Sequence, residues 1–408
     1  MMDSVPSEPI SIDEARARVL AEIHPLPAER VPVAGALGRV LAEEVRSGGD
    51  LPPFDSSAMD GYAVVAVAEP AELEVVAEAR AGAPASHGVE PGEAVRISTG
   101  ARMPPGADAV VPSERVTISD GRVAVPPVAA GANVRRAGED VKAGAAVLEP
   151  GTELGPAELA MLASLGHADV LCSRAPRVAI VVTGDELVEP GGELASGRIF
   201  NSNGPALAAL AARAGALVAS NARAPDEREA TRAALRHALE DTDVVCVSGG
   251  VSVGPHDHVK PALADLFVEE RFWGVALKPG KPTWFGVCPT GPIVFGLPGN
   301  PVSAMVTFQL FARPALRALA GADPSASRVR ARLDAPVARN PRREQAVRCR
   351  LRAADDGWHV EPTGPQGSHQ LSSMLGAGAL ALIGRGEGEV AAGELVDIEL
   401  LPGGTVGA

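Results

Sequence analysis

The segment DVVCVSGGVSVG, residues Asp243–Gly254, decides the fold of this chain. An apolar, β-branched run enters a glycine-rich turn, and the polar residues PHDHVK (Pro255–Lys260) follow it. A strand that ends in glycines ahead of a helix exposes backbone N–H groups, and these groups together with the helix N-terminus attract anions. The segment therefore predicts a strand whose carboxyl end binds a negatively charged ligand.

Two similar turns lie on either side of this segment, VVTGDEL (Val181–Leu187) and FGLPGNPVSA (Phe295–Ala304), and each follows an apolar run. Strands and helices are predicted to alternate around the three turns, at residues 178–182, 205–214, 227–239, 244–247, 293–295 and 302–319. This alternation predicts a three-layer αβα domain at residues 177–322 with a mainly parallel sheet. Ligands of such sheets bind at the carboxyl ends of the strands.

The N-terminal part of the chain has a different pattern. A helix is predicted at Ser11–Ile23, because Ser11 can cap it and Glu14 stands where a capping box needs an acid. Short alternating runs, including a hairpin turned at Asp120-Gly121, predict a β-rich domain inserted at residues 51–137.

A second helix, at Pro156–Leu165, is predicted to complete an N-terminal linking domain of helical and β structure, residues 8–50 and 138–176. After the αβα domain, short strands broken by Gly and Pro predict a C-terminal β-barrel at residues 326–408. The expected fold class is therefore multidomain α/β plus β.

The bulk composition argues against several function classes. The chain has 408 residues, 46% of them hydrophobic, and a formal net charge of -14. So acidic a chain lacks the basic surface that drives nucleic-acid binding, and it suits anionic membrane surfaces poorly. No apolar stretch approaches the roughly 20 residues that span a bilayer. The N-terminus carries acids where a signal peptide has a basic region and an apolar run.

The spacing of the cysteines argues against two further kinds of site. They lie far apart and none has CxxC spacing, so neither a zinc site nor a disulfide framework is predicted for Cys172, Cys246, Cys288 and Cys349. Together with the acidic N-terminus, this pattern leads us to expect a cytoplasmic protein.

Several acids stand just beyond the predicted strands. Asp185 and Glu186 follow the first of them, and Asp226 and Asp257 precede predicted helices. Such carboxylates suit Mg²⁺, which takes one or two of them plus substrate phosphates. Helix capping is the alternative for each, and it stays open at this point.

Two other pairs have competing explanations. Lys278 and Lys281 flank Pro279-Gly280, where they suit a phosphate or an oxyanion, although solubility is the simpler reason for exposed lysines. Two histidines one residue apart, His256 and His258, do not make a zinc site without further ligands. Their role is left open, and Asp257 between them is favoured as the functional residue.

Taken in order, nine segments resemble the MoeA family of molybdopterin molybdenumtransferases, to which the E domain of gephyrin is also related. They are PPFDSSAMDGYA (Pro52–Ala63), RISTGARMPPGADAVVPSE (Arg96–Glu114), GANVRRAGEDV (Gly131–Val141), TGDEL (Thr183–Leu187), IFNSN (Ile199–Asn203), SGGVSVG (Ser248–Gly254), KPGKP (Lys278–Pro282), LPGNPVSA (Leu297–Ala304) and PQGSHQLSSM (Pro365–Met374). Two departures are visible: Ser56 stands where the family often has Asn, and PHD (Pro255–Asp257) replaces commoner acidic or aromatic residues.

The resemblance implies a MogA-like molybdopterin-binding αβα domain and a Mg²⁺-dependent reaction of molybdate with adenylylated molybdopterin, giving molybdenum cofactor and AMP. By match to the family pattern, the catalytic residues are Asp60, Thr99, Asp140, Glu186, Asp226, Asp257, Lys278 and Lys281. The substrate-binding residues are Ser248, Gly249, Gly250, Ser252, Gly254, Pro298, Gly299, Asn300 and Pro301. Glu186, Asp226 and Asp257 are the expected magnesium ligands.

The family also implies a homodimer with an active-site cleft shared between subunits, a partner adenylyltransferase and apo-molybdoenzymes as acceptors. Two alternatives remain. The αβα domain also resembles molybdopterin adenylyltransferases, which are typically single-domain proteins, and a gephyrin-like scaffold need not be catalytic. The acids that a scaffold is free to lose are all present, which favours the enzyme.

Overall fold

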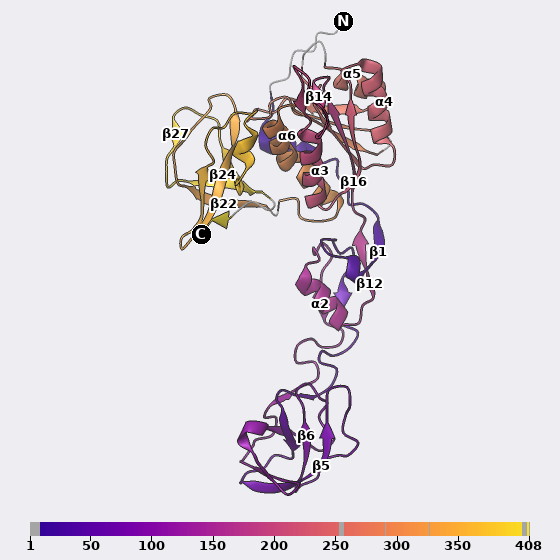
Figure 1. Ribbon diagram of the computed structural model, residues 1–408, viewed down its shortest axis with the longest axis vertical. Coiled ribbons are helices and arrows are strands. Elements are labelled where there is room, and N and C mark those ends of the chain that lie inside the picture. Colours follow the sequence, from indigo (N-terminus) through magenta and orange to yellow (C-terminus); the bar gives the residue numbers. More distant parts are fainter. Residues whose placement is uncertain (1–8, 253–256, 290, 326, 402–405, 408) are drawn as a thin grey trace. The chain divides into compact units, whose positions relative to one another are not determined.

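The computed structural model describes residues 9–252, 257–289, 291–325, 327–401 and 406–407. The chain forms two compact units (Figure 1). The larger unit comprises Met1–Glu29, Gly38–Ala42 and Leu171–Ala408, and the smaller unit comprises Arg30–Leu37 and Glu43–Val170. Strands β1 (Ala28–Pro32) and β12 (Asp169–Ser173) carry the chain from one unit to the other.

The larger unit is built on a six-stranded sheet of order β16-β13-β17-β21-β20-β18. The first four strands pair in parallel, and β20 pairs antiparallel with both β21 and β18. The strands of this sheet are β13 (Arg177–Thr183), β16 (Leu217–Ala224), β17 (Val244–Ser248), β18 (Glu269–Trp273), β20 (Trp284–Val287) and β21 (Ile293–Leu297). The three predicted strands are therefore present at the predicted positions, in a mainly parallel sheet.

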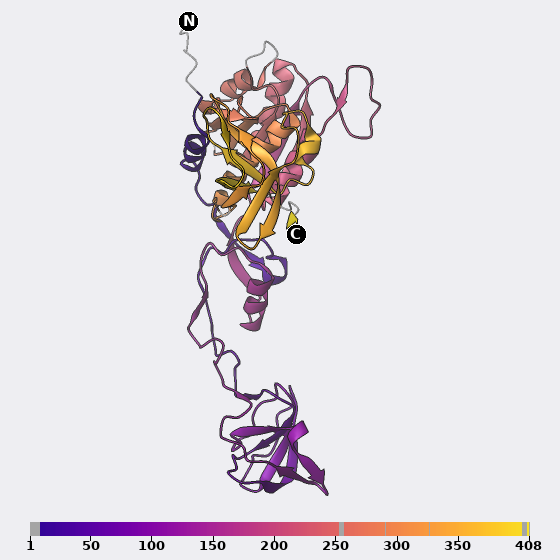
Figure 2. The same cartoon turned by 90° about the vertical axis from the view of Figure 1, so that its left-hand side faces the viewer.

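Helices cover both faces of this sheet (Figures 1 and 2), which confirms the three-layer αβα prediction. Side chains of β13 alternate between the faces: Val178 and Ile180 pack in one core, Ala179 and Val181 in the other. The first core is closed by α1 (Ile12–Leu20), α3 (Asn203–Arg213), α6 (Pro301–Thr307) and α7 (Arg313–Leu319). The second core is closed by α4 (Arg228–Leu239) and α5 (Val259–Asp265).

Two predicted helices differ in detail from the observed ones. The helix expected at residues 302–319 is interrupted by a π-helix, η3 (Phe308–Ala312), because Pro314 has no N–H to donate to the preceding turn. Helix α1 ends at Leu20, three residues early. The Ser11 hydroxyl does cap the helix by accepting from the backbone N–H of Glu14. The side chain of Glu14 binds Arg18, so only the first of the two capping-box hydrogen bonds is formed.

The C-terminal region of the larger unit is a closed five-stranded barrel, as predicted. The barrel order is β24-β25-β22-β28-β26, and β26 pairs back onto β24. These strands are β22 (Arg328–Leu333), β24 (Glu344–Ala354), β25 (Gly357–Pro362), β26 (Ala379–Ile383) and β28 (Leu395–Leu400). Short strands flank it: β19 (Leu277–Lys278), β23 (Val337–Ala338), β27 (Glu389–Val390) and β29 (Val406–Gly407), with a 3-10 turn η4 (Leu371–Met374).

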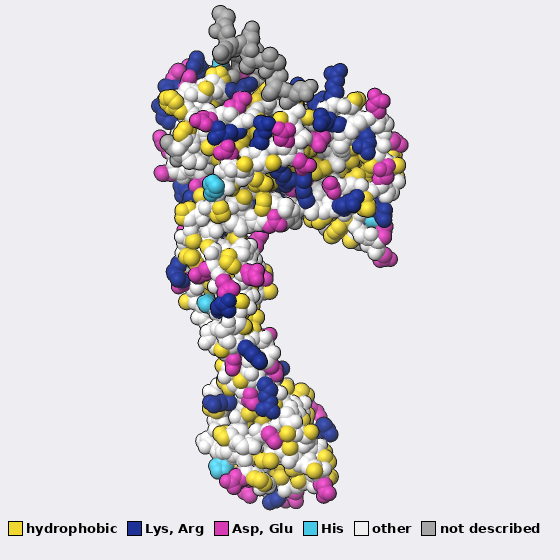
Figure 3. Space-filling model, turned by 180° about the vertical axis from the view of Figure 1, so that it is seen from behind, with side chains coloured by type: hydrophobic (Ala, Val, Ile, Leu, Met, Phe, Trp, Pro, Cys, Tyr) yellow, Lys and Arg dark blue, Asp and Glu magenta, His cyan; other side chains and the backbone are white. Residues whose placement is uncertain are grey.

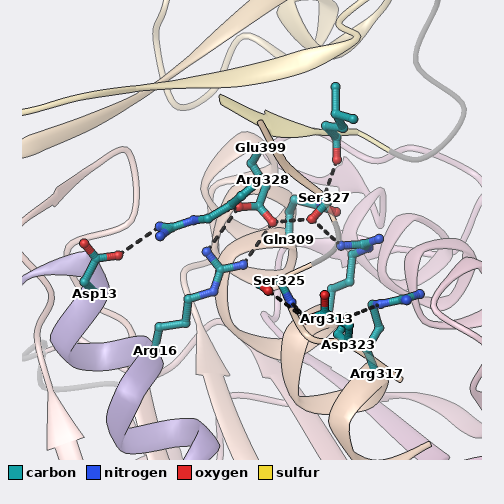
Figure 4. A network of polar contacts seen from close by, with 11 residues as sticks. Asp13, Arg16, Gln309, Arg313, Arg317, Asp323, Ser325, Ser327, Arg328 and Glu399 are labelled. Carbon is teal, nitrogen blue, oxygen red and sulfur yellow. Dashed lines mark hydrogen bonds and ion pairs between the residues drawn. The ribbon is translucent and has the colours of Figure 1, made fainter. Parts of the chain in front are cut away.

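A buried polar network fastens helix α1 to this barrel (Figure 4). Arg16 donates to both carboxylate oxygens of Glu399, at 2.9 and 3.1 Å, and the Glu399 side chain is fully buried. Arg328 binds the same carboxylate and reaches Asp13 on α1 at 2.9 Å. Ser327 also donates to Glu399. The paired charges satisfy each other, which is the condition for burying them.

The smaller unit contains a second six-stranded sheet, of order β7-β4-β6-β5-β9-β8. Its strands are β4 (Gly61–Val64), β5 (Ala71–Ala79), β6 (Glu93–Ile97), β7 (Ala109–Pro112), β8 (Thr117–Ser119) and β9 (Arg122–Val125). The predicted hairpin joins β8 to β9, with positive φ at Asp120 and Gly121. The remaining elements are η1 (Val33–Gly35), β2 (Val45–Arg46), β3 (Ser56–Ser57), η2 (Ser113–Arg115), β10 (Val134–Arg135), β11 (Ala146–Leu148) and α2 (Pro156–Ser164).

Two surface observations complete the description. Within the described ranges, no helix combines the length and the apolar character needed to cross a membrane. On the face drawn in Figure 3, Lys and Arg side chains are interspersed with Asp and Glu over both units, so this face has no continuous basic tract.

Candidate functional site

A cavity of about 620 Å³ lies at the carboxyl ends of β13, β17 and β21, where the sheet topology predicts a ligand. Three strand-end turns, the N-terminus of α3 and one residue of the C-terminal region line it. We call it the strand-end cavity. It brings together most of the residues predicted in this unit: Glu186, Asp226, Ser248, Gly249, Gly250, Ser252, Asp257, Pro298, Gly299, Asn300 and Pro301. Gly254 and His256 lie outside the described residues.

Hydrogen bonds between the turns fix the floor of this cavity. The Asn203 amide donates to the Ser248 hydroxyl at 2.9 Å and to the Gly299 carbonyl at 2.8 Å. Ser248 in turn donates to the Pro298 carbonyl at 3.1 Å, and its side chain is fully buried. Ser248 was predicted to bind substrate. Its hydroxyl is already satisfied within the protein, so its clearest role is to hold two turns together.

The glycines of the turn after β17 adopt left-handed conformations, with φ of 95° at Gly249 and 65° at Gly250. A Cβ on Gly249 would lie 2.6 Å from the hydroxyl oxygen of Thr183, and one on Gly250 would lie 2.7 Å from Val259. Glycine is therefore required here by the packing of the domain, in addition to any approach of a ligand.

The three predicted magnesium ligands all line the strand-end cavity. Glu186 is exposed and folds over Gly184, while Asp226 and Asp257 are half-buried. The capping alternative for Asp226 and Asp257 is wrong, because the residues at the helix N-caps are Glu227 and His258. Asp226 instead accepts a hydrogen bond from the backbone N–H of Asp185 at 3.2 Å.

Whether these acids fit Mg²⁺ depends on how the ion is held. Among the described residues, no group of three or more His, Cys, Asp or Glu side chains converges closely enough to hold a metal by itself. Mg²⁺ commonly binds one or two carboxylates and completes its shell with water and substrate phosphates. The acids of the strand-end cavity fit that second arrangement.

One wall of the cavity is apolar. Ile199 and Phe200 line it although these residues are 55% and 44% exposed. They form β15 (Ile199–Phe200), which pairs with β14 (Leu187–Val188) at the base of a loop that projects from the domain (Figure 2). An exposed aromatic beside a polar, glycine-lined floor suits a flat heterocycle that carries charged groups.

The C-terminal region supplies one further residue, His369, which the sequence analysis did not single out. Ser368 places it: its hydroxyl accepts from the Asn300 amide at 3.1 Å, and its carbonyl accepts from Val302 at 3.2 Å. The fully buried Arg348 holds the same loop through the Gly367 carbonyl at 3.2 Å, and burial lowers the pKa of its guanidinium. The available signal was the motif PQGSHQLSSM, which contains His369.

The two predicted lysines are placed elsewhere. Neither Lys278 nor Lys281 is among the described residues that line the strand-end cavity. Lys278 is exposed at the end of β19, which pairs with β24 of the barrel, and Lys281 lines a second cavity. Pro282, the next residue, does line the strand-end cavity.

Three predicted residues belong to the smaller unit. One carboxylate oxygen of Asp60 accepts from the backbone N–H of Thr99 at 2.6 Å and from its hydroxyl at 2.9 Å. These two hydrogen bonds hold the pKa of Asp60 below its usual value, the backbone bond contributing most. Asp140 is exposed, and its backbone N–H binds the Leu51 carbonyl at 3.1 Å.

Three family models match consecutive parts of the chain. The MoeA N-terminal region, domains I and II, matches residues 10–166. A probable molybdopterin binding domain matches residues 179–318, and the MoeA C-terminal region, domain IV, matches residues 330–401. The molybdopterin molybdenumtransferase of Haemophilus influenzae is 36% identical over 96% of this chain and 98% of its own length. The chain belongs to the MoeA family.

Other members agree with this assignment. Molybdopterin molybdenumtransferase 2 of Mycobacterium tuberculosis is 38% identical over 90% of this chain and 94% of its own length. The crystal structure of the molybdopterin biosynthesis MoeA protein from Pyrococcus horikoshii superposes with a TM-score of 0.81 at 33% identity, covering 97% of this chain and all of that one. All described lining residues of the strand-end cavity except His369 lie within the part of this MoeA-family chain that matches the molybdopterin binding model.

Proposed function

We propose that this MoeA-family protein is a molybdopterin molybdenumtransferase, which converts adenylylated molybdopterin and molybdate to molybdenum cofactor with release of AMP. The observation that carries the proposal is the strand-end cavity. It combines an apolar wall, a glycine-lined floor and three carboxylates within the segment that matches a probable molybdopterin binding domain. The names of relatives that cover nearly the whole chain support the same activity.

In this proposal, different residues of the cavity bind different parts of the substrate. Phe200 offers its ring to the pterin, and the turns at Gly249 and Gly299 let the backbone approach the phosphates. Glu186, Asp226 and Asp257 would hold Mg²⁺ against those phosphates. A bound Mg²⁺ would neutralise charge on the phosphoanhydride. His369 lines the same cavity and offers a ring nitrogen for a hydrogen bond to the substrate.

We also propose that the protein works as a homodimer whose active-site cleft is shared. The family resemblance assigns catalytic roles to Asp60, Thr99 and Asp140 as well as to acids of the larger unit, and a shared cleft accounts for this division. An Asp60→Ala chain mixed with an Asp257→Ala chain should then regain part of the activity, because each heterodimer has one intact site. Absence of recovery after confirmed subunit exchange would mean that each chain carries its own site.

The remaining features of the proposal follow from the reaction. A molybdopterin adenylyltransferase must supply the adenylylated substrate, and apo-molybdoenzymes must take the product. We also propose a cytoplasmic location.

The proposal is tested with the purified full-length chain, adenylylated molybdopterin, molybdate and Mg²⁺. AMP release and reconstitution of an apo-molybdoenzyme should both depend on molybdate and on the chain. If the chain instead adenylylates molybdopterin from ATP, it is an adenylyltransferase. If it binds molybdopterin without turnover under any of these conditions, a scaffold is the better description.

A further inference from the structure

Two asparagines of the segment IFNSN line the strand-end cavity, and their side chains are bonded differently. Both are more than nine-tenths buried, since Asn201 is 3% exposed and Asn203 is 8% exposed. The Asn201 amide is used through both of its polar atoms. Its nitrogen donates to the Glu189 carboxylate at 3.0 Å, and its oxygen accepts from the backbone N–H of Gly204 at 2.9 Å.

The Asn203 amide is used only through its nitrogen. That nitrogen has two hydrogens, which are donated to the Ser248 hydroxyl at 2.9 Å and to the Gly299 carbonyl at 2.8 Å. No described residue donates a hydrogen bond to the side-chain oxygen of Asn203. One hydrogen-bond acceptor therefore remains on a side chain that lines the cavity.

Backbone carbonyls fix the orientation of this amide. A carbonyl oxygen can only accept, so the atom of Asn203 that faces Gly299 must be the nitrogen. The Ser248 hydroxyl gives its proton to the Pro298 carbonyl at 3.1 Å, so towards Asn203 it acts as an acceptor. Both bonds exclude the flipped amide, in which nitrogen and oxygen exchange places.

The side-chain oxygen of Asn203 is also accessible. In the described part of the chain, it is not one of the fully buried side-chain atoms that lack a hydrogen-bond partner. Because Asn203 lines the strand-end cavity, a ligand reaches the oxygen from there. A ligand that covers the oxygen without donating to it leaves a buried acceptor unpaired, which is unfavourable. The cavity therefore selects a ligand with an N–H or O–H donor at this point.

Other residues of the cavity narrow the kind of donor. Phe200 offers an exposed aromatic ring, which suits a flat heterocycle. The carboxylates of Glu186, Asp226 and Asp257 suit a cation held against phosphates. The amide oxygen of Asn203, by contrast, has no formal charge and accepts from an uncharged donor without attracting an ion. An amino group on the edge of a heterocycle is such a donor.

We propose that Asn203 is a specificity-determining residue, whose side-chain oxygen accepts a hydrogen bond from the exocyclic amino group of a bound heterocycle. The inference rests on the proposed function for the identity of the ligand. Adenylylated molybdopterin has two rings with such a group, the pterin and the adenine. The same side chain thus joins two turns of the cavity and binds the ligand.

The test compares ligands that differ in the amino group. AMP is compared with purine riboside monophosphate, which lacks this group, and pterin-6-carboxylate is compared with its deamino analogue. In calorimetric titrations of the full-length wild-type protein, the deamino member of at least one pair should bind about three- to tenfold more weakly, as loss of a neutral hydrogen bond predicts. In Asn203→Ala, the two members of that pair should bind with equal affinity.

Ser248→Ala is the matched control. It removes the acceptor for one N–H of Asn203 together with the bond to Pro298, so it loosens the same turns and keeps the Asn203 oxygen. The preference for the amino ligand should survive in this variant, even where both ligands bind more weakly. Melting temperatures report how far each substitution disturbs the packing.

The pair that shows the preference identifies the ring. A preference within the AMP pair alone assigns the adenine, one within the pterin pair alone assigns the pterin, and a preference within both means that either ring occupies the position. A preference that persists in Asn203→Ala would overturn the inference. So would equal binding within both pairs, or no binding of any of the four ligands, by the wild-type protein. That comparison needs no variant, so it stands if Asn203→Ala does not fold.

These measurements are made without turnover, which separates the inference from the proposed function. If wild-type protein shows the preference and Asn203→Ala lacks it, the inference holds even where molybdate-dependent AMP release fails. If AMP release proceeds and the wild-type protein shows no preference, the proposed function holds and Asn203 serves only to join the turns.

Discussion

Asp185 and Asp226 hold each other's backbones across the carboxyl ends of β13 and β16. The N–H of Asp185 donates to the carboxylate of Asp226, and the N–H of Asp226 donates to the carboxylate of Asp185, both at 3.2 Å. Only Asp226 lines the strand-end cavity. The reciprocal pair therefore contains one acid that faces the proposed substrate and one that serves the scaffold.

The charge of Asp226 can therefore be tested separately from the hydrogen bond that it accepts from Asp185. Asp226→Asn keeps an oxygen that accepts from Asp185, so we expect a change in the free energy of unfolding below about 0.5 kcal/mol. Loss of the charge should lower molybdate-dependent AMP release and raise the Mg²⁺ concentration needed for half-maximal rate. Asp185→Asn is the control, since it keeps the same backbone bond outside the cavity. Equal magnesium dependence in both variants would remove Asp226 from the metal site.

The sequence predicted the scaffold of this site well, because its signals are local. Apolar runs such as Val244–Val247 that end in glycine turns are sufficient to predict strands with a ligand at their carboxyl ends. Most of the predicted residues of the larger unit accordingly line one cavity. The capping interpretation of Asp226 failed for a long-range reason: a bond to Asp185, 41 residues away in the chain, competes with the local cap.

Gly250 gives a prediction about stability. A side chain there adopts an unfavourable φ and also meets Val259, so Gly250→Val should lower the free energy of unfolding by about 2 kcal/mol or more. Chemical denaturation measures this. Gly299→Ala is the matched control, since a Cβ at Gly299 approaches no atom more closely than 3.7 Å. A stable Gly250→Val protein with impaired ligand binding would show that ligand approach alone requires this glycine.

The buried carboxylate of Glu399 gives a second stability prediction. Glu399→Gln leaves the buried guanidinium of Arg16 without its counter-charge, and we expect a loss of about 3 kcal/mol in the free energy of unfolding. Asp397→Asn on the same strand is the control. Asp397 is 69% exposed and lies 3.9 Å from Arg330, so its loss should cost less than about 0.5 kcal/mol. Similar midpoints in denaturant for both variants would show that the network of Figure 4 contributes little.

The carboxylate of Asp60 gives a prediction about pH. Its hydrogen bonds from Thr99 lower its pKa in the folded protein, so the stability they provide is present above the unfolded value, about 3.9, and is lost as pH falls through the lower folded value. Thr99→Val removes the hydroxyl donor and keeps the backbone donor. An NMR titration should therefore find the pKa of Asp60 raised part of the way toward its usual value. No change would mean that the hydroxyl bond is absent in solution.

Other parts of the site could not be predicted from the sequence, because they depend on tertiary packing. His369 reaches the strand-end cavity because the Asn300 amide binds the Ser368 hydroxyl. The sequence around Asn300 and the sequence around Ser368 contain no pattern that predicts this long-range contact. Lys281 follows a glycine turn just as the cavity residues do, yet it lines a second cavity. The side of a turn from which a side chain emerges is set by pairing with the barrel, which local patterns do not encode.

Hydrogen exchange tests most directly whether the strand-end cavity is the substrate site. The full-length protein is labelled in deuterated buffer with and without adenylylated molybdopterin, and exchange is followed by mass spectrometry. We predict slower exchange in peptides that cover residues 247–252 and 297–303 and in the first turn of α3, with no change in the barrel strand β25. Unchanged exchange at all three cavity segments under saturating ligand, with protection elsewhere in the chain, would contradict the assignment of this cavity.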